Sequence, residues 1–355
     1  MELTLRKISV HEIRQPLKRP FKTYLQEVRE RESLLVVVKD REGGVGYGEC
    51  VAFSTPWYTE ETVASCLFVL KEILMPLLEG KTFQHPRDVF PALSAVKGNR
   101  MAKAAIETAV WDLYAKRMNR PLWQLVGGTH PCISAGVVVA TNDAGHLAKE
   151  VQRAAQAGYK RVKLKINRES DPEQLQHVIS QYPHLLFFGD ANGAFTAASY
   201  DKLCKLDACG FTLIEQPFGE QEWELHAKAN EELKTAICLD ESISSFEDAE
   251  RMVQMKAGTV AVLKMGRLGG WHETLRVYEW FHASGIHMWV GGMIEFGVSK
   301  AHNLALASLP GIDLPGDFPA SHHYWEQDII SPRIEVVQGE IQLSDESGIG
   351  YEVFI

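Results

Sequence analysis

The chain has 355 residues, a formal net charge of −9 at pH 7 and a sequence pI of about 5.8. This length suits one large domain with a smaller one, and 45% hydrophobic and 23% charged residues are ordinary for a globular protein. The acidic balance disfavours nucleic acid as a partner, and there is neither a run of roughly 18 apolar residues nor an apolar signal region. We expect a cytoplasmic protein with no membrane partner. The six cysteines include no C-x-x-C pair, so free buried thiols are expected.

The first fifty residues predict an antiparallel β meander, in which the sequence DREGG forms the last turn. Three helical patterns follow: TEETVASCLFVLKEILMPLLEG, HPRDVFPALSAV and MAKAAIETAVWDLYAKRM. We expect the first helix to be capped at Thr59, and Met101 and Trp111 of the third to lie in the core. Strands followed by helices indicate a separate α+β unit.

From about Ile133, short apolar runs alternate with amphipathic helical stretches. The runs are ISAGVVVA, RVKLKI, LLFFGDA, FTLIEQP, AICLDE, VAVLKM, HMWVGG and GIDLP. Eight strands with a helix after most of them predict a β/α barrel. A doubly wound open sheet is the alternative, but it usually has fewer strands and a Gly-rich first turn. The final stretch returns to β character with a turn at Gln338-Gly339, and we expect it to run back to the N-terminal unit.

The strand VKLKIN raises an electrostatic problem, because alternation places Lys163 and Lys165 on one face, where two cations repel. Polar residues also end five successive predicted strands at intervals of 25, 25, 25 and 24: Lys165, Asp190, Glu215, Asp240 and Lys264. One βα unit takes about this many residues, so each interval returns the chain to the same level along the barrel axis. We therefore expect a ring of ionisable side chains at the C-terminal mouth of the barrel.

Three clustered carboxylates repel one another unless a cation lies among them, and oxygen ligands suit Mg²⁺, with Mn²⁺ as a substitute. A salt bridge or a helix cap would explain one acid, but not three in phase. Lys163 and the metal would both disfavour the protonated form of Lys165, which makes Lys165 a candidate base. The metal could bind a substrate carboxylate and stabilise the enediolate that forms when the α-proton leaves.

The motifs KLK, GDAN, IEQP, LDES and LKMGRLGG, at the ends of successive predicted strands, resemble the muconate-lactonizing subgroup of the enolase superfamily. Longer stretches, among them STPWYTEET, GGMIEFGVSKAHNLALASLP and LPGDFPAS, are most similar to the branch that contains o-succinylbenzoate synthases and N-succinylamino acid racemases. The resemblance covers essentially the whole chain. It implies an α+β capping domain (1–130), a (β/α)7β barrel (131–325), a tail (326–355) that returns to the capping domain, and one Mg²⁺.

The activity implied by the resemblance is that of a carbon–oxygen lyase of menaquinone biosynthesis. It is the Mg²⁺-dependent syn dehydration of 2-succinyl-6-hydroxy-2,4-cyclohexadiene-1-carboxylate, a small carboxylate, to o-succinylbenzoate. The alternative is N-succinylamino acid racemisation, or both activities together. A non-catalytic metal-binding barrel is more remote, because neither a base nor a ligand is missing. The oligomeric state, including a homo-oligomer, stays open.

Carried over residue by residue, the resemblance makes Asp190, Glu215 and Asp240 the metal ligands and Lys165 the acid/base. Lys264 is the opposing cation and Lys163 tunes Lys165. Residues expected around these groups or against the substrate are Asn192, Glu241, Arg267, Gly292, Met293, Glu295 and Phe296. The loop from about Arg19 to Arg29 would cover the substrate.

Two positions depart from the family pattern: Met265 replaces a usual proline, and Phe296 stands in the motif usually written ETG, where it is expected to reshape the acyl pocket. His287 starts a strand and is expected to be structural, which disfavours a mandelate-type dehydratase. Asp313 and Asp317 have the wrong spacing for a dipeptide epimerase. We expect the last two histidines, His322 and His323, at the surface.

Overall fold

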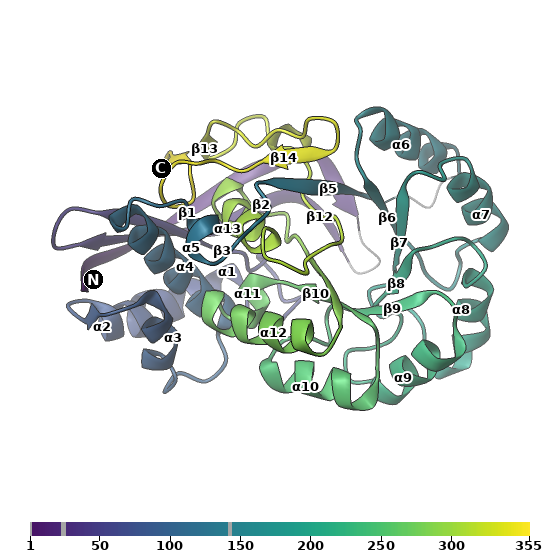
Figure 1. Cartoon of the computed structure of the whole chain (residues 1–355), viewed down its shortest axis with the longest axis horizontal. Helices are drawn as coiled ribbons and strands as arrows, with labels where there is room; N and C mark the ends of the chain where they lie inside the picture. The colour runs from purple at the N-terminus through teal and green to yellow at the C-terminus, as the bar shows by residue number, and fades with distance from the viewer. Residues whose placement is uncertain (1, 23–25, 141–143) are drawn as a thin grey trace.

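The computed structural model describes residues 2–22, 26–140 and 144–355. An antiparallel sheet formed by the N-terminal residues lies beside a nearly closed parallel barrel, whose helices α6 to α10 and α12 form an arc around the strands (Figure 1). The predicted fold class, a (β/α)7β barrel with an α+β unit at its side, is confirmed. No helix in these described ranges is long and apolar enough to cross a membrane.

The N-terminal sheet has the strand order β3-β2-β1-β4. Its strands are β1 (Leu3–Lys22), β2 (Glu27–Asp40), β3 (Val45–Cys50) and β4 (Thr82–Phe83). Helix α4 (Arg100–Arg117) packs closely on β3, because a Cβ at Gly46 or Gly48 would lie 2.1 Å from a carbonyl oxygen of the helix. Met101 and Trp111 of α4 are buried, as predicted.

The first helix of this unit begins later than expected. Thr62, not Thr59, is its N-cap, and the Thr62 hydroxyl accepts a hydrogen bond from the amide of Ser65 at 3.2 Å. The remaining elements of the unit are α1 (Val63–Val69), the π-helical turn η1 (Leu70–Leu74), α2 (Met75–Leu78), η2 (Pro86–Asp88), α3 (Val89–Ala92) and α5 (Leu122–Leu125).

The barrel strands follow one another in the order of the chain from β5 to β11, and β12 pairs in parallel with β5. The strands are β5 (Cys132–Val139), β6 (Arg161–Lys165), β7 (Leu186–Asp190), β8 (Leu213–Glu215), β9 (Ala236–Leu239), β10 (Val260–Leu263), β11 (His287–Val290) and β12 (Gly316–Asp317). The principal helices between them are α6 (Ala144–Gln156), α7 (Pro172–Ser180), α8 (Tyr200–Leu206), α9 (Trp223–Glu232), α10 (Phe246–Met255), α12 (Trp271–Ala283) and α13 (Gly297–Ala307). Three short helices complete the set: η3 (Ala197–Ser199), α11 (Met265–Leu268) and α14 (Ser321–Tyr324).

The barrel interior is divided into an apolar floor and a polar mouth. A separate buried cluster fills the floor with Phe188, Leu213, Cys238, Val260, Val262 and Trp289. The ionisable residues of the predicted ring lie at or just beyond the C-terminal ends of strands β6 to β10. Side chains that fill a barrel leave no pore, so the floor closes the mouth from below.

The eighth strand differs from its prediction. We expected it at GIDLP (311–315), but β12 is Gly316–Asp317, and Ile312 forms only an isolated bridge with Met288. Prolines at 310 and 315 have no amide hydrogen to donate, so continuous pairing begins only after Pro315.

The tail contacts both parts of the molecule. After the turn at Gln338-Gly339, β14 (Glu340–Gln342) pairs with barrel strand β5 (Figure 1). The amide of Leu122 donates to the carbonyl of Gly348 at 2.7 Å. Strand β13 (Ile330–Ser331) pairs with β15 (Glu352–Val353).

Two local expectations were wrong. The cysteines are free as predicted, but Cys132 and Cys204 are exposed while the other four are buried. The loop expected over residues 19–29 is shorter, because β1 extends to Lys22 and β2 starts at Glu27. Residues 23–25 of that loop lie outside the described residues.

Candidate active site

Parallel pairing brings the predicted ring together. Lys165 pairs with Asp190, which in turn pairs with Glu215, so these three side chains occupy neighbouring positions on β6, β7 and β8. Asp240 and Lys264 directly follow β9 and β10. Strands β6 and β10 are separated by β7, β8 and β9, so Lys165 and Lys264 stand on opposite sides of the mouth.

The two lysines of VKLKIN face the same carboxylate. Lys165 Nζ lies 2.6 Å and Lys163 Nζ 3.4 Å from Asp190 Oδ2. Lys163 Nζ is also 3.2 Å from Glu215 Oε2 and 2.9 Å from Asp317 Oδ2. The surrounding carboxylates therefore offset the repulsion between the two ammonium groups.

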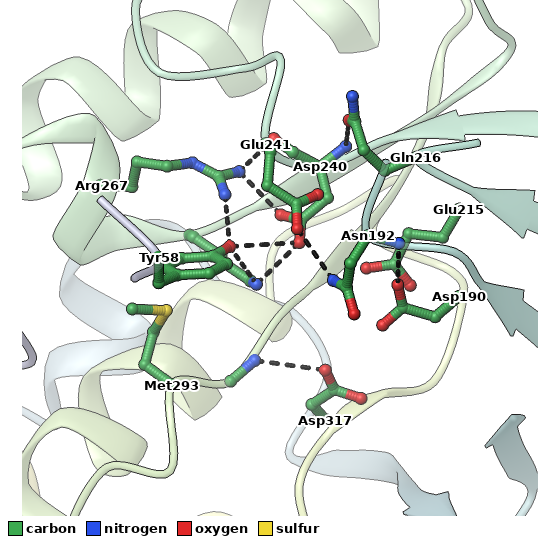
Figure 2. A network of polar contacts seen from close by, with 12 residues as sticks. Tyr58, Asp190, Asn192, Glu215, Gln216, Asp240, Glu241, Arg267, Met293 and Asp317 are labelled. Atoms are coloured by element: carbon green, nitrogen blue, oxygen red, sulfur yellow. Dashed lines mark hydrogen bonds and ion pairs between the residues drawn. The ribbon is translucent and has the colours of Figure 1, made fainter. Parts of the chain in front are cut away.

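Asp240 is the centre of a second cluster, shown in Figure 2 together with Tyr58 and Arg267. Its carboxylate lies 2.8 Å from Lys264 Nζ and 2.7 Å from Arg267 Nη2. Burial opposes its ionised form, but Arg267 and Lys264 outweigh burial and hold the pKa of Asp240 well below its usual range. Burial likewise opposes the charge on Lys264, yet Asp240 raises the pKa of Lys264 above its usual value.

Asn192 links the two clusters (Figure 2). Its Oδ1 accepts a hydrogen bond from Lys165 Nζ at 2.6 Å, and its Nδ2 donates to Glu241 Oε1 at 2.8 Å. Burial and the neighbouring Asp240 raise the pKa of Glu241 to about 7. Asn192 and Glu241 thus hold Lys165 in place, consistent with the expectation that they surround the central groups.

The acidic residues suit a hard divalent cation, although the described residues do not form a ready set of three converging metal ligands. Ammonium groups of the three lysines lie against the carboxylates instead. Glu215 is fully buried, and its Oε2 has the ion pair with Lys163 at 3.2 Å but no aligned hydrogen bond from any described residue. Burial, followed by the charge of Asp190, raises the pKa of Glu215 well above its usual value. Additional positive charge would stabilise this carboxylate, and carboxylate oxygens are the ligands that Mg²⁺ prefers.

A pocket of about 620 Å³, including the space at its open mouth, lies over these residues. Four aromatic residues of the N-terminal part form one wall: Phe21, Phe53, Trp57 and Tyr58. Gly292, Met293, Ile294 and Glu295, all after β11, form another. Ile294 has a φ of +54°, a strained conformation for a β-branched residue, as is frequent where a loop is held in place at a binding site.

Phe296 does not lie where we expected. It is not among the described residues that line the pocket, and its fully buried ring stacks on Trp325 with centroids 4.2 Å apart. Its extended backbone precedes α13 and directs the ring into this packing. Any effect of Phe296 on the acyl pocket must therefore pass through the neighbouring loop. Met265, the other departure, is buried at the start of α11.

Sequence reasoning missed several pocket residues. The Tyr58 hydroxyl accepts hydrogen bonds from Lys264 Nζ and Arg267 Nη1, both at 2.6 Å. Asp317 ends β12 and binds Lys163. The other ring residues were predicted as polar residues at strand ends, and Asp317 would have been predicted in the same way if the eighth strand had been placed correctly. Lys300 and Tyr324 also line the pocket, and no pattern in the sequence indicated them.

Among the described residues, His287, His322, His323 and Asp313 do not line this pocket. His287 is exposed, with Nδ1 3.3 Å from Asp313 Oδ2. His322 and His323 are exposed, as predicted.

Known proteins are similar to this chain over almost its whole length. Residues 6–127 match the family described as mandelate racemase / muconate lactonizing enzyme, N-terminal domain, and residues 146–354 match the enolase C-terminal domain-like family. The o-succinylbenzoate synthase of Bacillus subtilis is 39% identical, covering 99% of this chain and 95% of that protein. The N-succinylamino acid racemase of Thermus thermophilus is 39% identical, covering 94% and 91%. A solved enolase superfamily member from Listeria innocua has a TM-score of 0.95 at 36% identity, covering 99% and 95%.

Proposed function

The chain belongs to the mandelate racemase/muconate lactonizing enzyme family of the enolase superfamily, and on this basis we propose that it is an o-succinylbenzoate synthase. It would dehydrate 2-succinyl-6-hydroxy-2,4-cyclohexadiene-1-carboxylate to o-succinylbenzoate. The observation that carries the proposal is the pair of lysines on opposite sides of a carboxylate cluster, in a chain that is 39% and 41% identical to o-succinylbenzoate synthases of Bacillus subtilis and Geobacillus kaustophilus.

We assign a role to each part of the chain. Residues 1–130 act as the capping domain, 131–325 carry the chemistry, and 326–355 return to the capping domain. Asp190, Glu215 and Asp240 would hold a Mg²⁺ ion, or Mn²⁺ in its place. When bound, this ion would supply positive charge to the substrate carboxylate as the α-proton leaves.

Lys165 performs both proton transfers of the dehydration. Its Nζ removes the α-proton, and the same proton then goes to the hydroxyl group that departs as water. A single group can do both because the two bonds break on one face of the ring. Asn192 accepts from Lys165 Nζ at 2.6 Å and orients it toward the pocket.

Lys264 stays protonated on the opposite side and stabilises the developing negative charge. Asp240, 2.8 Å away, holds this cation in position. Lys163 and Arg267 hold the surrounding carboxylates, and Tyr58 closes the site from the capping domain.

N-succinylamino acid racemisation is the second candidate function. It needs a base on each face of the α-carbon, and Lys165 and Lys264 both line the pocket from opposite sides. Relatives named N-succinylamino acid racemase, at 36% and 39% identity, also favour this candidate. We rank dehydration first because relatives named as o-succinylbenzoate synthases, at 39%, 41% and 40% identity, match 99% of this chain.

The test is an assay of the purified protein with Mg²⁺ on both substrates, with kcat/KM measured for each. We expect dehydration to be faster, to stop in EDTA and to return with Mg²⁺. A higher value for racemisation would reverse the ranking. Absence of α-proton exchange in D₂O with either substrate would instead favour a non-catalytic barrel.

A further inference from the structure

Lys300, on α13, is a buried cation in the pocket wall that the proposed chemistry does not use. Its side chain is buried, and its Nζ donates to the carbonyl oxygen of Pro319 at 3.0 Å. No described carboxylate lies within ion-pairing distance of this Nζ. An ammonium group has three donors, so the carbonyl of Pro319 satisfies only one of them.

The other lysines of the pocket are different. Lys163 pairs with Asp317, Lys165 with Asp190 and Lys264 with Asp240, at 2.9, 2.6 and 2.8 Å. Among the described residues that line the pocket, Lys300 is therefore the lysine without an acidic partner.

Three acids favour the charged form of Lys300: Asp328, Glu295 and Glu49. Each of them already accepts hydrogen bonds from other groups. Asp328 accepts from the amide of Gly297 and the hydroxyl of Ser321. Glu295 accepts from the amide of Met293 and from Asn303.

Glu49 completes this set, since it accepts from the amides of Phe296 and Ser299. Burial of Lys300 consequently prevails over these acids and lowers its pKa below the usual value. A buried, incompletely paired ammonium is costly, and an anion in the pocket would offset that cost.

The proposed substrates supply such an anion. Each carries one carboxylate at the reacting carbon and a second at the end of the succinyl chain. The first belongs with the metal ligands and Lys165. Lys300 is on a different element, after β11, beside the ring of Tyr324, whose centroid is 5.7 Å from Nζ. Phe21 packs edge-on against Tyr324, so apolar surface adjoins the cation, as a methylene chain requires.

We propose that Lys300 binds the terminal carboxylate of the succinyl group and thereby selects succinyl over uncharged acyl substrates. This inference rests on the proposed function, because it takes its ligand from that reaction. Lys300 is a specificity-determining residue here and takes no part in proton transfer.

The test compares N-succinyl- and N-butanoyl-phenylglycine, in which a methyl group replaces the terminal carboxylate. The KM of the N-succinyl compound would be measured by α-proton exchange in D₂O. For Lys300→Met we expect this KM to rise about 10–100-fold, where each tenfold corresponds to about 1.4 kcal/mol of binding free energy. KM for the N-butanoyl compound should stay within about twofold of the wild-type value. Lys300→Arg keeps the positive charge and should retain most of the preference for the N-succinyl compound. Lys149→Met, at an exposed lysine, is the control. Equal losses on both compounds would overturn the proposal in favour of a structural role.

A binding experiment separates this proposal from the proposed function. Calorimetry with Mg²⁺ would compare o-succinylbenzoate with 2-butanoylbenzoate, and needs no turnover. If wild type prefers the dicarboxylate and Lys300→Met does not, Lys300 has the proposed role even if the dehydration assay fails. If wild type shows no preference, or binds neither compound, the inference is wrong. Should Lys300→Met not fold, Lys300→Gln takes its place in both experiments.

Discussion

At the scale of single residues, the positions of Lys165 and Lys264 separate the two candidate reactions. Dehydration needs one acid/base, whereas racemisation needs one on each face. Lys165→Ala should abolish both reactions. Lys264→Arg keeps the charge but provides no usable base, so it should abolish racemisation and leave reduced dehydration.

Because general acid–base groups contribute about 10²–10⁴-fold, steady-state rates on both substrates will detect these losses. Deuterium exchange provides the control: Lys264→Arg should still exchange the α-proton of the enantiomer that faces Lys165. Near-normal dehydration by Lys165→Ala would show that the role given to this lysine is wrong.

Tyr58 provides a second prediction at this scale. Its hydroxyl accepts from Lys264 and Arg267 and donates to Asp240 Oδ2 at 3.2 Å. Tyr58→Phe removes all three hydrogen bonds without opening a large cavity. Hydrogen bonds to charged groups contribute about 1.5–3 kcal/mol, so we expect kcat to fall roughly 10–100-fold.

The control for this prediction is Tyr200→Phe, because the Tyr200 hydroxyl bonds to Glu232, which is not among the residues that line the pocket. Circular dichroism would verify the fold of both variants. Equal kcat values for Tyr58→Phe and the wild type would show that the hydroxyl does not help to position Lys264.

Which residues of the site could be predicted depended on their position in the chain. Asp190, Glu215 and Asp240 could be predicted because strand ends in a barrel recur at a regular interval. Tyr58 belongs to a loop of the other part of the molecule, and Lys300 to a helix. Neither has a partner at a fixed sequence distance, so only three-dimensional packing reveals them.

At the scale of elements, carboxylates of the N-terminal part cap two barrel helices. Glu107, on α4, accepts from the amide of His272 at the start of α12 at 2.8 Å. Glu49, on β3, accepts from the amides of Phe296 and Ser299 at the start of α13, both at 2.9 Å. The amides at a helix N-terminus have no partner within the helix, and these carboxyl oxygens supply one, so the contacts join the two parts of the molecule.

The Glu49 cap predicts a pH dependence of stability. Burial raises the pKa of Glu49 to about 7 in the folded protein, from an ordinary value of 4.5. Between these values the folded state binds more protons than the unfolded state, so this group lowers the free energy of unfolding as pH rises from about 4.5 to about 7.

In Glu49→Gln that contribution is absent, and the free energy of unfolding should fall less steeply over the same range. The expected difference is on the order of 1–3 kcal/mol between the ends of the range. Urea unfolding of both proteins at several pH values measures it, and the other buried acids cancel in the comparison. Parallel pH curves would contradict the assignment.

Local sequence predicted the type of these elements better than their limits. The eighth strand was misplaced because Pro310 and Pro315 interrupt pairing on either side of an apolar run. The first helix was given the wrong cap because Thr59, with Glu60 and Glu61 behind it, resembles an N-cap as closely as Thr62 does. Only the contact of the Thr62 hydroxyl with the amide of Ser65 distinguishes them.

At the scale of the whole molecule, metal binding should stabilise the fold. A cation that binds the native but not the unfolded chain raises the free energy of unfolding by RT ln(1 + [L]/Kd), about 2.7 kcal/mol at 100 times Kd. We therefore expect Mg²⁺ to raise the Tm of EDTA-treated protein. Glu215→Gln should fold but lose this increase, because an amide is a poor ligand for a hard cation.

Differential scanning calorimetry with and without Mg²⁺ measures this increase. Glu222→Gln, at an exposed acid, is the matched control and should respond as wild type does. An unchanged Tm for wild type at millimolar Mg²⁺ would contradict the metal assignment.

The overall architecture was the most predictable level, because a barrel repeats one pattern and each repeat supports the others. The individual contacts of the C-terminal tail were less predictable. The hydrogen bond from Leu122 to Gly348 and the pairing of β14 with β5 join segments far apart in the chain, and no local pattern marks them.

The pocket draws its walls from both parts of the chain, and this has a consequence for how such a protein can diverge. Phe53 and Trp57 contact the space above the reacting groups but belong to a segment that carries none of the ring residues. Substitutions there can alter which molecule is accepted while the proton-transfer apparatus is inherited intact. Tyr58 limits this freedom, since its hydroxyl bonds to barrel residues. A recombinant gene that joins the N-terminal segment of one relative to the barrel of another would therefore need to keep Tyr58 and its partners from compatible parents.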